Sequence, residues 1–219
     1  MNFGVVIFPG SNCDKDIISC IERTVNQKVI ELWHKDTDLQ NCDVIFLPGG
    51  FSFGDYLRSG AIAKFSPIME KVIDFGRNGG YIIGICNGFQ ILTESGLLPG
   101  ALLHNTSNKF ICKNVFLKIN NTNTLVTNSY EKNVIKVPIA HGEGRFFADE
   151  NTMKDLKQND QIIFKYCDSN GEVLESSNPN GSLENIAGIC NKEKNIFGMM
   201  PHPELSLIHI SEPTRLSWI

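Results

Sequence analysis

The fold of the first half of this chain is restricted most strongly by an alternation of two patterns. Continuous apolar runs alternate with segments whose apolar residues recur at helical spacing. Apolar residues recur at helical spacing over 17–25 and 62–75. The runs themselves end at turn residues and stand at 3–8, 28–33, 43–48 and 81–85. Uninterrupted apolar runs are typical of parallel strands covered on both faces. This order predicts an α/β fold, with an open, mostly parallel, twisted sheet, helices on both faces and functional loops at the strand ends.

The second half of the chain is richer in strand patterns. Its runs, with Asn, Gly and Ser turns between them, stand at 115–119, 134–142, 161–167, 186–190 and 196–200. The sequence contains no internal repeat, no low-complexity linker and no break in composition. A single domain is therefore favoured over two.

Charge and composition exclude several classes of function. The 219 residues include 20 Lys and Arg against 24 Asp and Glu, without a basic cluster, which gives no electrostatic case for nucleic acid. No apolar run approaches the roughly 20 residues of a membrane helix. The first ten residues read as a strand and lack the basic start of a signal peptide. The seven Cys are scattered without a C-x-x-C pair, so we expect a cytoplasmic protein with no disulfide framework and no metal site.

The segment YIIGICNGFQIL at 81–92 carries the strongest sign of chemistry. A buried strand leads through Gly84, Cys86 and Gly88 into a helix-like stretch, which is the form of a nucleophile elbow with Cys in place of Ser. The turn is so tight that side chains at the two glycines would collide with backbone. We expect Cys86 to point into solvent above a helix N-terminus that favours the thiolate. The alternative, that Cys is a small buried hydrophobe, is accepted for the other six.

A second segment, MMPHPE at 199–204, offers a base for that thiol. The flanking prolines exclude helix and hold His202 in an extended conformation. In an extended segment His202 and Glu204 project to the same side, so Glu204 can accept from one imidazole nitrogen while the other faces a thiol. A lone His after a strand is otherwise an ordinary loop residue.

Backbone donors complete the expected constellation. Gly50, in the strand-ending sequence LPGGF, offers an unencumbered N–H, and the Asn87 N–H follows the nucleophile directly. Two such donors form an oxyanion hole. Without the elbow, LPGGF would be read as an ordinary turn.

Four motifs in order carry a resemblance to a known family: PGGFSFGDYLRSGAIA, GICNGFQIL, PIAHGEGRF and MMPHPE. The chain resembles class I (triad) glutamine amidotransferases, and more narrowly the glutaminase subunits of phosphoribosylformylglycinamidine synthase. The similarity runs from FPGSNCD near the start to Glu204. The amidotransferase class is indicated by C-x-G-x-Q together with P-H-P-E. The narrower resemblance to the synthase subunits rests on GGFSFGDYLR and AHGEGRF. The resemblance implies a flavodoxin-like α/β fold.

The resemblance also implies roles for individual residues. Cys86 would be the nucleophile, His202 the base and Glu204 the acid that orients it. Besides a contact near Gly50, glutamine contacts are implied at Phe51, Gln90, His141, Gly142 and Glu143. Gln90 is one helical turn beyond Cys86 and can face the same pocket.

The implied activity is glutamine hydrolysis to glutamate and ammonia through a Cys thioester. Ammonia would pass to a large synthetase subunit that converts formylglycinamide ribonucleotide to the amidine for purine synthesis. ATP and magnesium would belong to that partner, because this chain has no P-loop and no cofactor is implied for it. A small third subunit that bridges the two is also implied.

Two alternatives stay open from the sequence. A DJ-1-like cysteine hydrolase or chaperone has a similar sheet, but that class usually lacks P-H-P-E. A catalytically dead amidotransferase-fold partner subunit is the second alternative, although all three triad residue types are present. A glutamine hydrolysis assay discriminates both from an active glutaminase.

The C-terminal residues form a separate feature. Residues 205–215 read LSLIHISEPTR, which matches the in-frame translation of a transposase sequencing adapter. We therefore expect an amidotransferase domain over 1–204 and an artefactual tail over 205–219, in place of the Arg and final helix that usually follow P-H-P-E. The alternative is a genuine C-terminal segment interrupted by Pro213.

Overall fold

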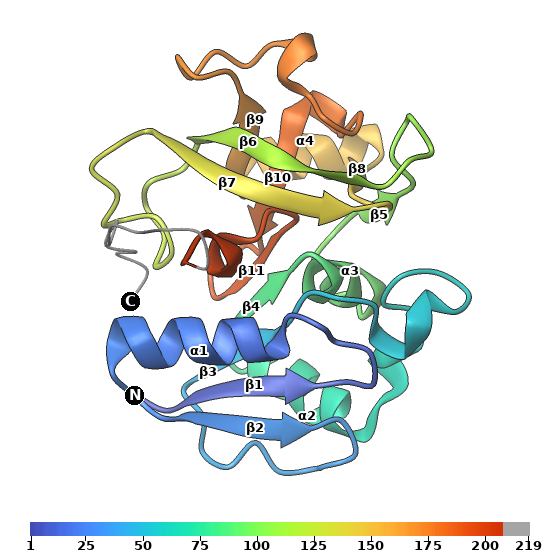
Figure 1. Cartoon of the computed structure of the whole chain (residues 1–219), viewed down its shortest axis with the longest axis vertical. Coiled ribbons are helices and arrows are strands. Elements are labelled where there is room, and N and C mark those ends of the chain that lie inside the picture. Colours follow the sequence, from blue (N-terminus) through green and yellow to red (C-terminus); the bar gives the residue numbers. More distant parts are fainter. Residues whose placement is uncertain (208–219) are drawn as a thin grey trace. The chain divides into compact units, whose positions relative to one another are not determined.

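The computed structural model describes residues 1–207, which form two compact units (Figure 1). The first unit contains Met1–Leu98 and Asn195–Gly198, and the second contains Pro99–Lys194 and, of the described residues, 199–207. The sequence, without any break in composition, did not indicate this division. Residues 208–219, which hold most of the expected tail, lie outside the described part, so the boundary after residue 204 stays a prediction.

The first unit is built on a parallel sheet. Strand β1 pairs in parallel with β2 and β3, and β3 pairs in parallel with β4. The strands lie in the order β2 (Val29–Trp33), β1 (Phe3–Ile7), β3 (Val44–Leu47), β4 (Tyr81–Ile85) and β11 (Ile196–Met199). Every residue of β3 is buried, as expected for a strand covered on both faces. The predicted α/β, flavodoxin-like arrangement is confirmed, and the predicted site residues Gly50 and Cys86 follow the carboxyl ends of β3 and β4.

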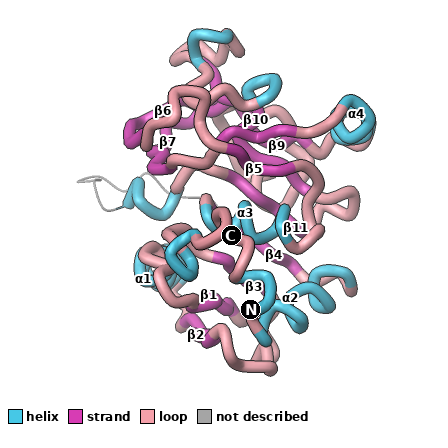
Figure 2. Tube along the Cα trace, turned by 90° about the vertical axis from the view of Figure 1, so that its right-hand side faces the viewer, coloured by secondary structure: helices cyan, strands magenta, loops and turns pink. Residues whose placement is uncertain are grey.

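Three helices cover this sheet. Figure 2 shows α1 (Asp14–Val25) and α2 (Pro67–Arg77) on opposite sides of the strands, and α3 (Asn87–Glu94) follows β4. The helix predicted from residue 62 begins later, at Pro67. A residue before proline is held extended, so Ser66, at ψ 140°, separates α2 from a short 3-10 turn at Ala63–Phe65.

The second unit is antiparallel, so the chain as a whole has a mixed sheet and not a mostly parallel one. Its strands lie in the order β10 (Ile186–Cys190), β9 (Ile162–Cys167), β6 (Ile111–Ile119) and β7 (Val134–His141). All three of these pairings are antiparallel. A separate ladder and one helix were not predicted: β5 (Ala101–Leu103), β8 (Arg145–Phe147) and α4 (Glu150–Gln158). Short 3-10 turns lie at Glu175–Ser177, Leu183–Asn185 and Pro203–Leu207 in this unit, and at Ser52–Asp55 in the first unit.

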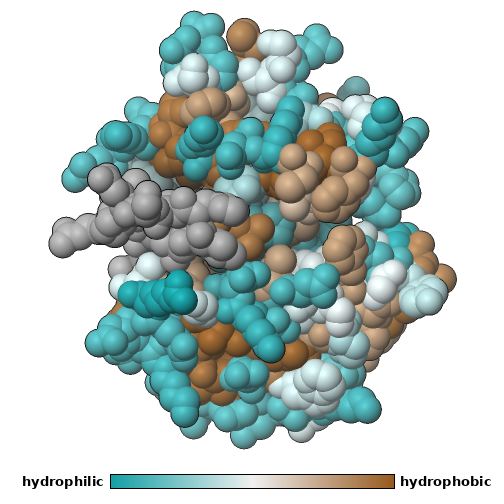
Figure 3. Space-filling model, in the orientation of Figure 1, coloured by the Kyte–Doolittle hydropathy of each residue, from teal (hydrophilic) through white to brown (hydrophobic). Residues whose placement is uncertain are grey.

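The surface is hydrophilic over much of the face seen in Figure 3, with hydrophobic patches between the hydrophilic residues. Large apolar side chains that are exposed in the first unit include Tyr56, Leu57 and Phe65. Among the described residues, no helix is both long and apolar enough to cross a membrane.

Candidate active site

The predicted elbow is present where β4 passes into α3. Cys86 stands at the turn with φ 51° and ψ −104°, a strained conformation for a residue with a side chain. A Cβ at Gly88 would overlap the carbonyl oxygen of Leu47, and a Cβ at Gly84 would lie 2.7 Å from the Gly88 carbonyl. Both glycines are therefore required by the close approach of backbone, as the sequence indicated.

Exposure of the thiol was predicted wrongly. Cys86 is only 5% exposed, whereas the elbow motif predicts a side chain that points into solvent. An elbow fixes the direction in which its central side chain leaves the sheet. It does not fix how much of the remaining chain surrounds that side chain.

Replacement of Gly88 by alanine should destabilise the protein severely. The added methyl group would overlap the Leu47 carbonyl, which is held in the sheet, so we expect a loss of about 3 kcal/mol or more in the free energy of unfolding. The matched control is Gly96→Ala, because Gly96 has φ 70° but open space around it, and should lose about 1 kcal/mol. Urea unfolding of both variants is the measurement. A loss at Gly88 no larger than the loss at Gly96 would mean that the Leu47 carbonyl can move aside, and that the close approach does not require glycine at position 88.

The segment after β3 lies against the elbow. Gly50 has φ 122°, and a Cβ there would collide with the backbone nitrogen of Asn12. The Phe51 N–H donates to Gly10 O at 2.9 Å, and the Phe51 side chain is 45% exposed. The next N–H, that of Ser52, donates to the side chain of Asn87 at 3.2 Å. Gly50 and Phe51 are thereby held close to α3.

Gln90 joins this first group of predicted residues. It lies on α3, is nearly buried, and its Oε1 accepts a hydrogen bond from Asn87 Nδ2 at 2.9 Å. The first unit thus contains five of the predicted site residues: Gly50, Phe51, Cys86, Asn87 and Gln90.

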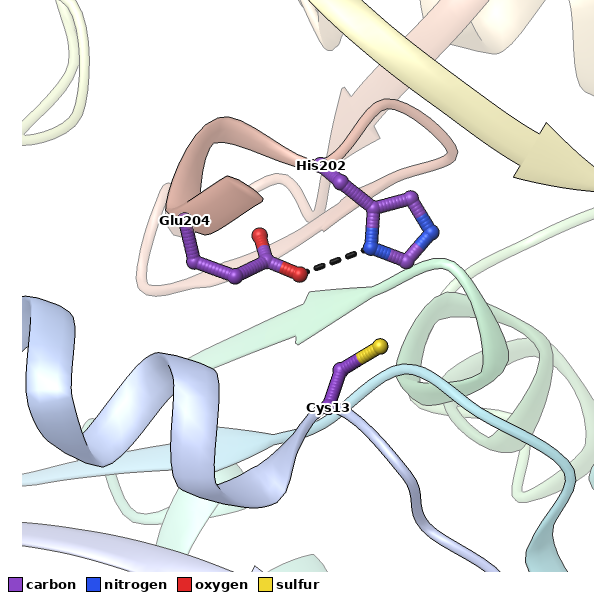
Figure 4. A group of neighbouring side chains, drawn as sticks. All are labelled: Cys13, His202 and Glu204. Carbon is purple, nitrogen blue, oxygen red and sulfur yellow. Dashed lines mark hydrogen bonds and ion pairs between the residues drawn. The ribbon is translucent and has the colours of Figure 1, made fainter. Parts of the chain in front are cut away.

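The second unit contains the predicted base and its acid. His202 Nδ1 lies 2.7 Å from Glu204 Oε1 (Figure 4). Both side chains are almost fully buried. The His202 N–H donates to Pro138 O on β7 at 2.9 Å, which fixes the backbone of the pair. The sequence predicted this pairing from an extended segment, and that part was wrong. Glu204 lies in the 3-10 turn Pro203–Leu207, yet its carboxylate still reaches the imidazole.

His141 is held by an asparagine that sequence reasoning missed. Asn105 Nδ2 donates to His141 O at 2.9 Å, so its Oδ1 must face His141 Nδ1, at 3.1 Å. That oxygen also accepts the Gly144 N–H at 3.1 Å. Because Asn105 Oδ1 can only accept, Nδ1 of His141 carries the proton. A lone Asn between a strand and a turn gives no sequence signal for such a role.

The neighbouring residues of His141 complete the second group. A Cβ at Gly144 would overlap the His141 ring, which explains the glycine. Gly142 and Glu143 are partly buried, and Glu143 Oε1 lies 3.5 Å from His104 Nε2. The second unit thus contains the other five predicted site residues: His141, Gly142, Glu143, His202 and Glu204.

The charge state of His141 gives a prediction for acid stability. Burial, and after it the charge of His202, lower the pKa of His141 to about 4. The unfolded chain, with a histidine pKa near about 6.5, binds a proton first as pH falls, so stability is present above pH 6.5 and lost towards pH 4. The expected loss from this group is about 3 kcal/mol. Urea unfolding between pH 7 and 4 should show a shallower loss for His141→Gln than for the parent. His104→Gln, at an exposed histidine, is the control; a slope unchanged by His141→Gln would contradict the assignment.

The chain matches a known protein family over almost its whole length. The model of a family described as the CobB/CobQ-like glutamine amidotransferase domain matches residues 1–217. The chain belongs to this glutamine amidotransferase family.

Named relatives of this amidotransferase match it over most of its length. A protein of Moorella thermoacetica named phosphoribosylformylglycinamidine synthase subunit PurQ is 56% identical over 205 residues, covering 93% of this chain and 87% of its own length. The PurQ protein of Acaryochloris marina is 52% identical over 215 residues, covering 98% and 90%. A chain in the structure of PurLQS from Thermotoga maritima is 42% identical, with a TM-score of 0.78 and coverage of 93% and 87%. The predicted resemblance is confirmed, while the roles of the site residues in this amidotransferase stay predictions.

Proposed function

We propose that this amidotransferase is the glutaminase subunit of a phosphoribosylformylglycinamidine synthase. It hydrolyses glutamine to glutamate and ammonia, and the ammonia serves the conversion of formylglycinamide ribonucleotide to formylglycinamidine ribonucleotide in purine synthesis. The observation that carries the proposal is the 56% identity with a PurQ protein over 205 residues. An alignment of that length covers 93% of the chain and therefore includes parts of both units.

The chemistry begins with the Cys86 thiolate attacking the side-chain amide carbon of glutamine. The new C–S bond gives a tetrahedral oxyanion, and protonated His202 then gives its proton to the departing nitrogen, which leaves as ammonia. In the second half, His202 takes a proton from water, which attacks the thioester and releases glutamate and the thiolate. The His202–Glu204 bond at 2.7 Å supports this assignment, because the carboxylate orients the imidazole and stabilises its charged form.

The oxyanion would be held by the backbone N–H groups of Gly50 and Asn87. Asn87 is the first residue of α3, and amides in the first turn of a helix have no acceptor within that helix. Such donors act where charge develops, and removal of one typically costs about 100- to 1000-fold in rate. Phe51, Gln90, His141, Gly142 and Glu143 are proposed to contact glutamine.

A synthetase subunit and a small bridging subunit are the proposed partners. The synthetase would bind ATP and magnesium and consume the ammonia, so this chain would need no cofactor of its own. We place the complex in the cytoplasm, since the scattered cysteines suit a reducing compartment.

The test is synthesis of the amidine by this chain combined with a synthetase and bridging subunit from a related organism. Glutamine-dependent synthesis should require this chain, whereas synthesis from ammonium salts should not. If the mixture binds but releases no glutamate from glutamine, the chain is a catalytically dead partner. If the chain neither associates nor hydrolyses glutamine, the proposed function is wrong.

A further inference from the structure

The side chain of Asn87 occupies a central place that the backbone role proposed above does not use. Asn87 follows Cys86 directly and is completely buried. Its Oδ1 accepts the Ser52 N–H at 3.2 Å. Its Nδ2 donates to Gln90 Oε1 at 2.9 Å and to Asp55 Oδ1 at 3.3 Å. One amide thus connects the nucleophile's helix with the segment that begins at Gly50.

The orientation of the Asn87 side-chain amide is set by the backbone N–H of Ser52, which is a donor in either orientation of that amide. The backbone N–H of Ser52 can only donate, so the oxygen of Asn87 must face it. The nitrogen of Asn87 must then face the oxygens of Gln90 and Asp55. Consequently the oxygen of Gln90 is turned toward Asn87, and its N–H groups are turned away from Asn87.

The segment held by Asn87 has an unusual backbone. Phe53 and Asp55 have φ of 54° and 53°, in the left-handed region that side chains rarely adopt. The Phe53 N–H is bonded to Pro9 O at 2.6 Å, and the Phe53 ring packs near Phe8 and His34. A strained segment keeps its shape only when several contacts fix it, and two of these end on the Asn87 amide.

We propose that Asn87 is a positioning residue for glutamine hydrolysis. Its side chain turns the amide of Gln90 so that an N–H donor, and not a carbonyl, is presented to an oxygen of glutamine. It also holds the segment from Gly50 to Asp55 in place for the oxyanion. The inference rests on the proposed function.

The substitution Asn87→Asp replaces the donor NH2 group of this side chain by an acceptor oxygen, with little change in shape. The new carboxylate still accepts the Ser52 N–H. It has no donor for Gln90, so the Gln90 amide reverses and presents its oxygen to glutamine. It also repels the carboxylate of Asp55. Recognition of glutamine should therefore suffer more than the intrinsic reactivity of Cys86.

The experiment compares two labels for Cys86 in the full chain assembled with its synthetase. A chloroketone analogue of glutamine requires glutamine recognition, whereas iodoacetamide requires only an accessible thiolate. Asn87→Asp should slow labelling by the chloroketone at least tenfold and raise KM for glutamine at least tenfold. Labelling by iodoacetamide should stay within about threefold of the parent. Equal slowing with both labels would overturn the proposal, as would an unchanged KM.

Two further variants separate positioning from stability. Asn195→Ala is the matched control, because Asn195 is a buried asparagine of the same unit that donates to Gly76 O and Gly80 O. It should lower thermal stability without changing the ratio of the two labelling rates. In a Gln90→Ala background, Asn87 has no Gln90 amide to orient, so Asn87→Asp should slow chloroketone labelling by no more than about threefold. A tenfold slowing in that background would overturn the proposal that Asn87 acts through Gln90. If the parent chain itself is not labelled by the chloroketone, the proposed function fails and not the role of Asn87.

Discussion

Replacement of Cys86 by alanine is expected to abolish glutamine-dependent synthesis by the assembled enzyme while ammonia-dependent synthesis continues. Without the thiolate no thioester forms, and loss of a covalent nucleophile reduces turnover by at least about a thousandfold. Ammonia supplied in solution does not pass through Cys86, so that rate should stay within about twofold of the parent. The measurement is formation of the amidine with saturating glutamine and, separately, with ammonium chloride.

The same experiment has a control and a clear contrary outcome. Cys112 is the exposed cysteine of the second unit, and Cys112→Ala should leave both rates unchanged. A chloroketone analogue of glutamine should add its mass to Cys86 and leave the remaining cysteines unmodified. If Cys86→Ala kept glutamine hydrolysis within tenfold of the parent, Cys86 would not be the nucleophile.

The parallel half of the fold was predictable because its central strands, β1 and β3, are buried on both faces and are therefore apolar at nearly every position. The apolar runs match β1 to β4 within about a residue at each end, although the edge strand β2 also exposes Glu31 and Trp33. The elbow was predictable for a related reason. Only glycine fits at position 88, beside the Leu47 carbonyl, and at position 84, beside the Gly88 backbone. The two glycines in the sequence therefore indicate the tight turn directly.

The antiparallel half was less predictable. Helix α4 was missed because it buries only Met153 and Leu156 and is otherwise polar, so its apolar pattern is weak. The short strands β5 and β8 have three residues each, too few for a period-two pattern to be recognised. The division into two units follows contacts between distant parts of the chain, and nothing in local composition marks it.

Within the candidate site, the proposed catalytic side chains lie in recognisable motifs, whereas the side-chain hydrogen bonds of the asparagines near them could not be predicted from the sequence. Cys86, His202 and Glu204 stand in motifs whose residue types indicate their chemistry. The side chains of both asparagines bond to residues far away in the sequence. Asn105 bonds to His141, 36 positions away, and Asn87 bonds to Ser52, 35 positions away. Asparagine is also common in turns, so its presence carried no specific signal.

Loss of His202 is expected to be more damaging than loss of Glu204. His202 transfers protons in both halves of the proposed reaction, and loss of a general base costs about 100- to 10,000-fold. Without Glu204 the imidazole remains, although its tautomer and orientation are no longer held by the 2.7 Å bond. Removal of the orienting acid from such triads costs less than removal of the base. Glu204→Gln should lose least of all, because its amide oxygen can still accept from His202 Nδ1.

The measurement is single-turnover hydrolysis of glutamine by the three variants, each in complex with the synthetase. The two alanine variants must be compared on folded protein, because each leaves a partner that is only 1% or 2% exposed without its hydrogen bond. Thermal unfolding of each variant provides that check. Asn195→Ala supplies a folded variant with a buried hydrogen-bonding defect but no proposed role in catalysis. If Glu204→Ala were as slow as His202→Ala at equal stability, Glu204 would take part in proton transfer itself, and the assignment of an orienting acid would have to be replaced.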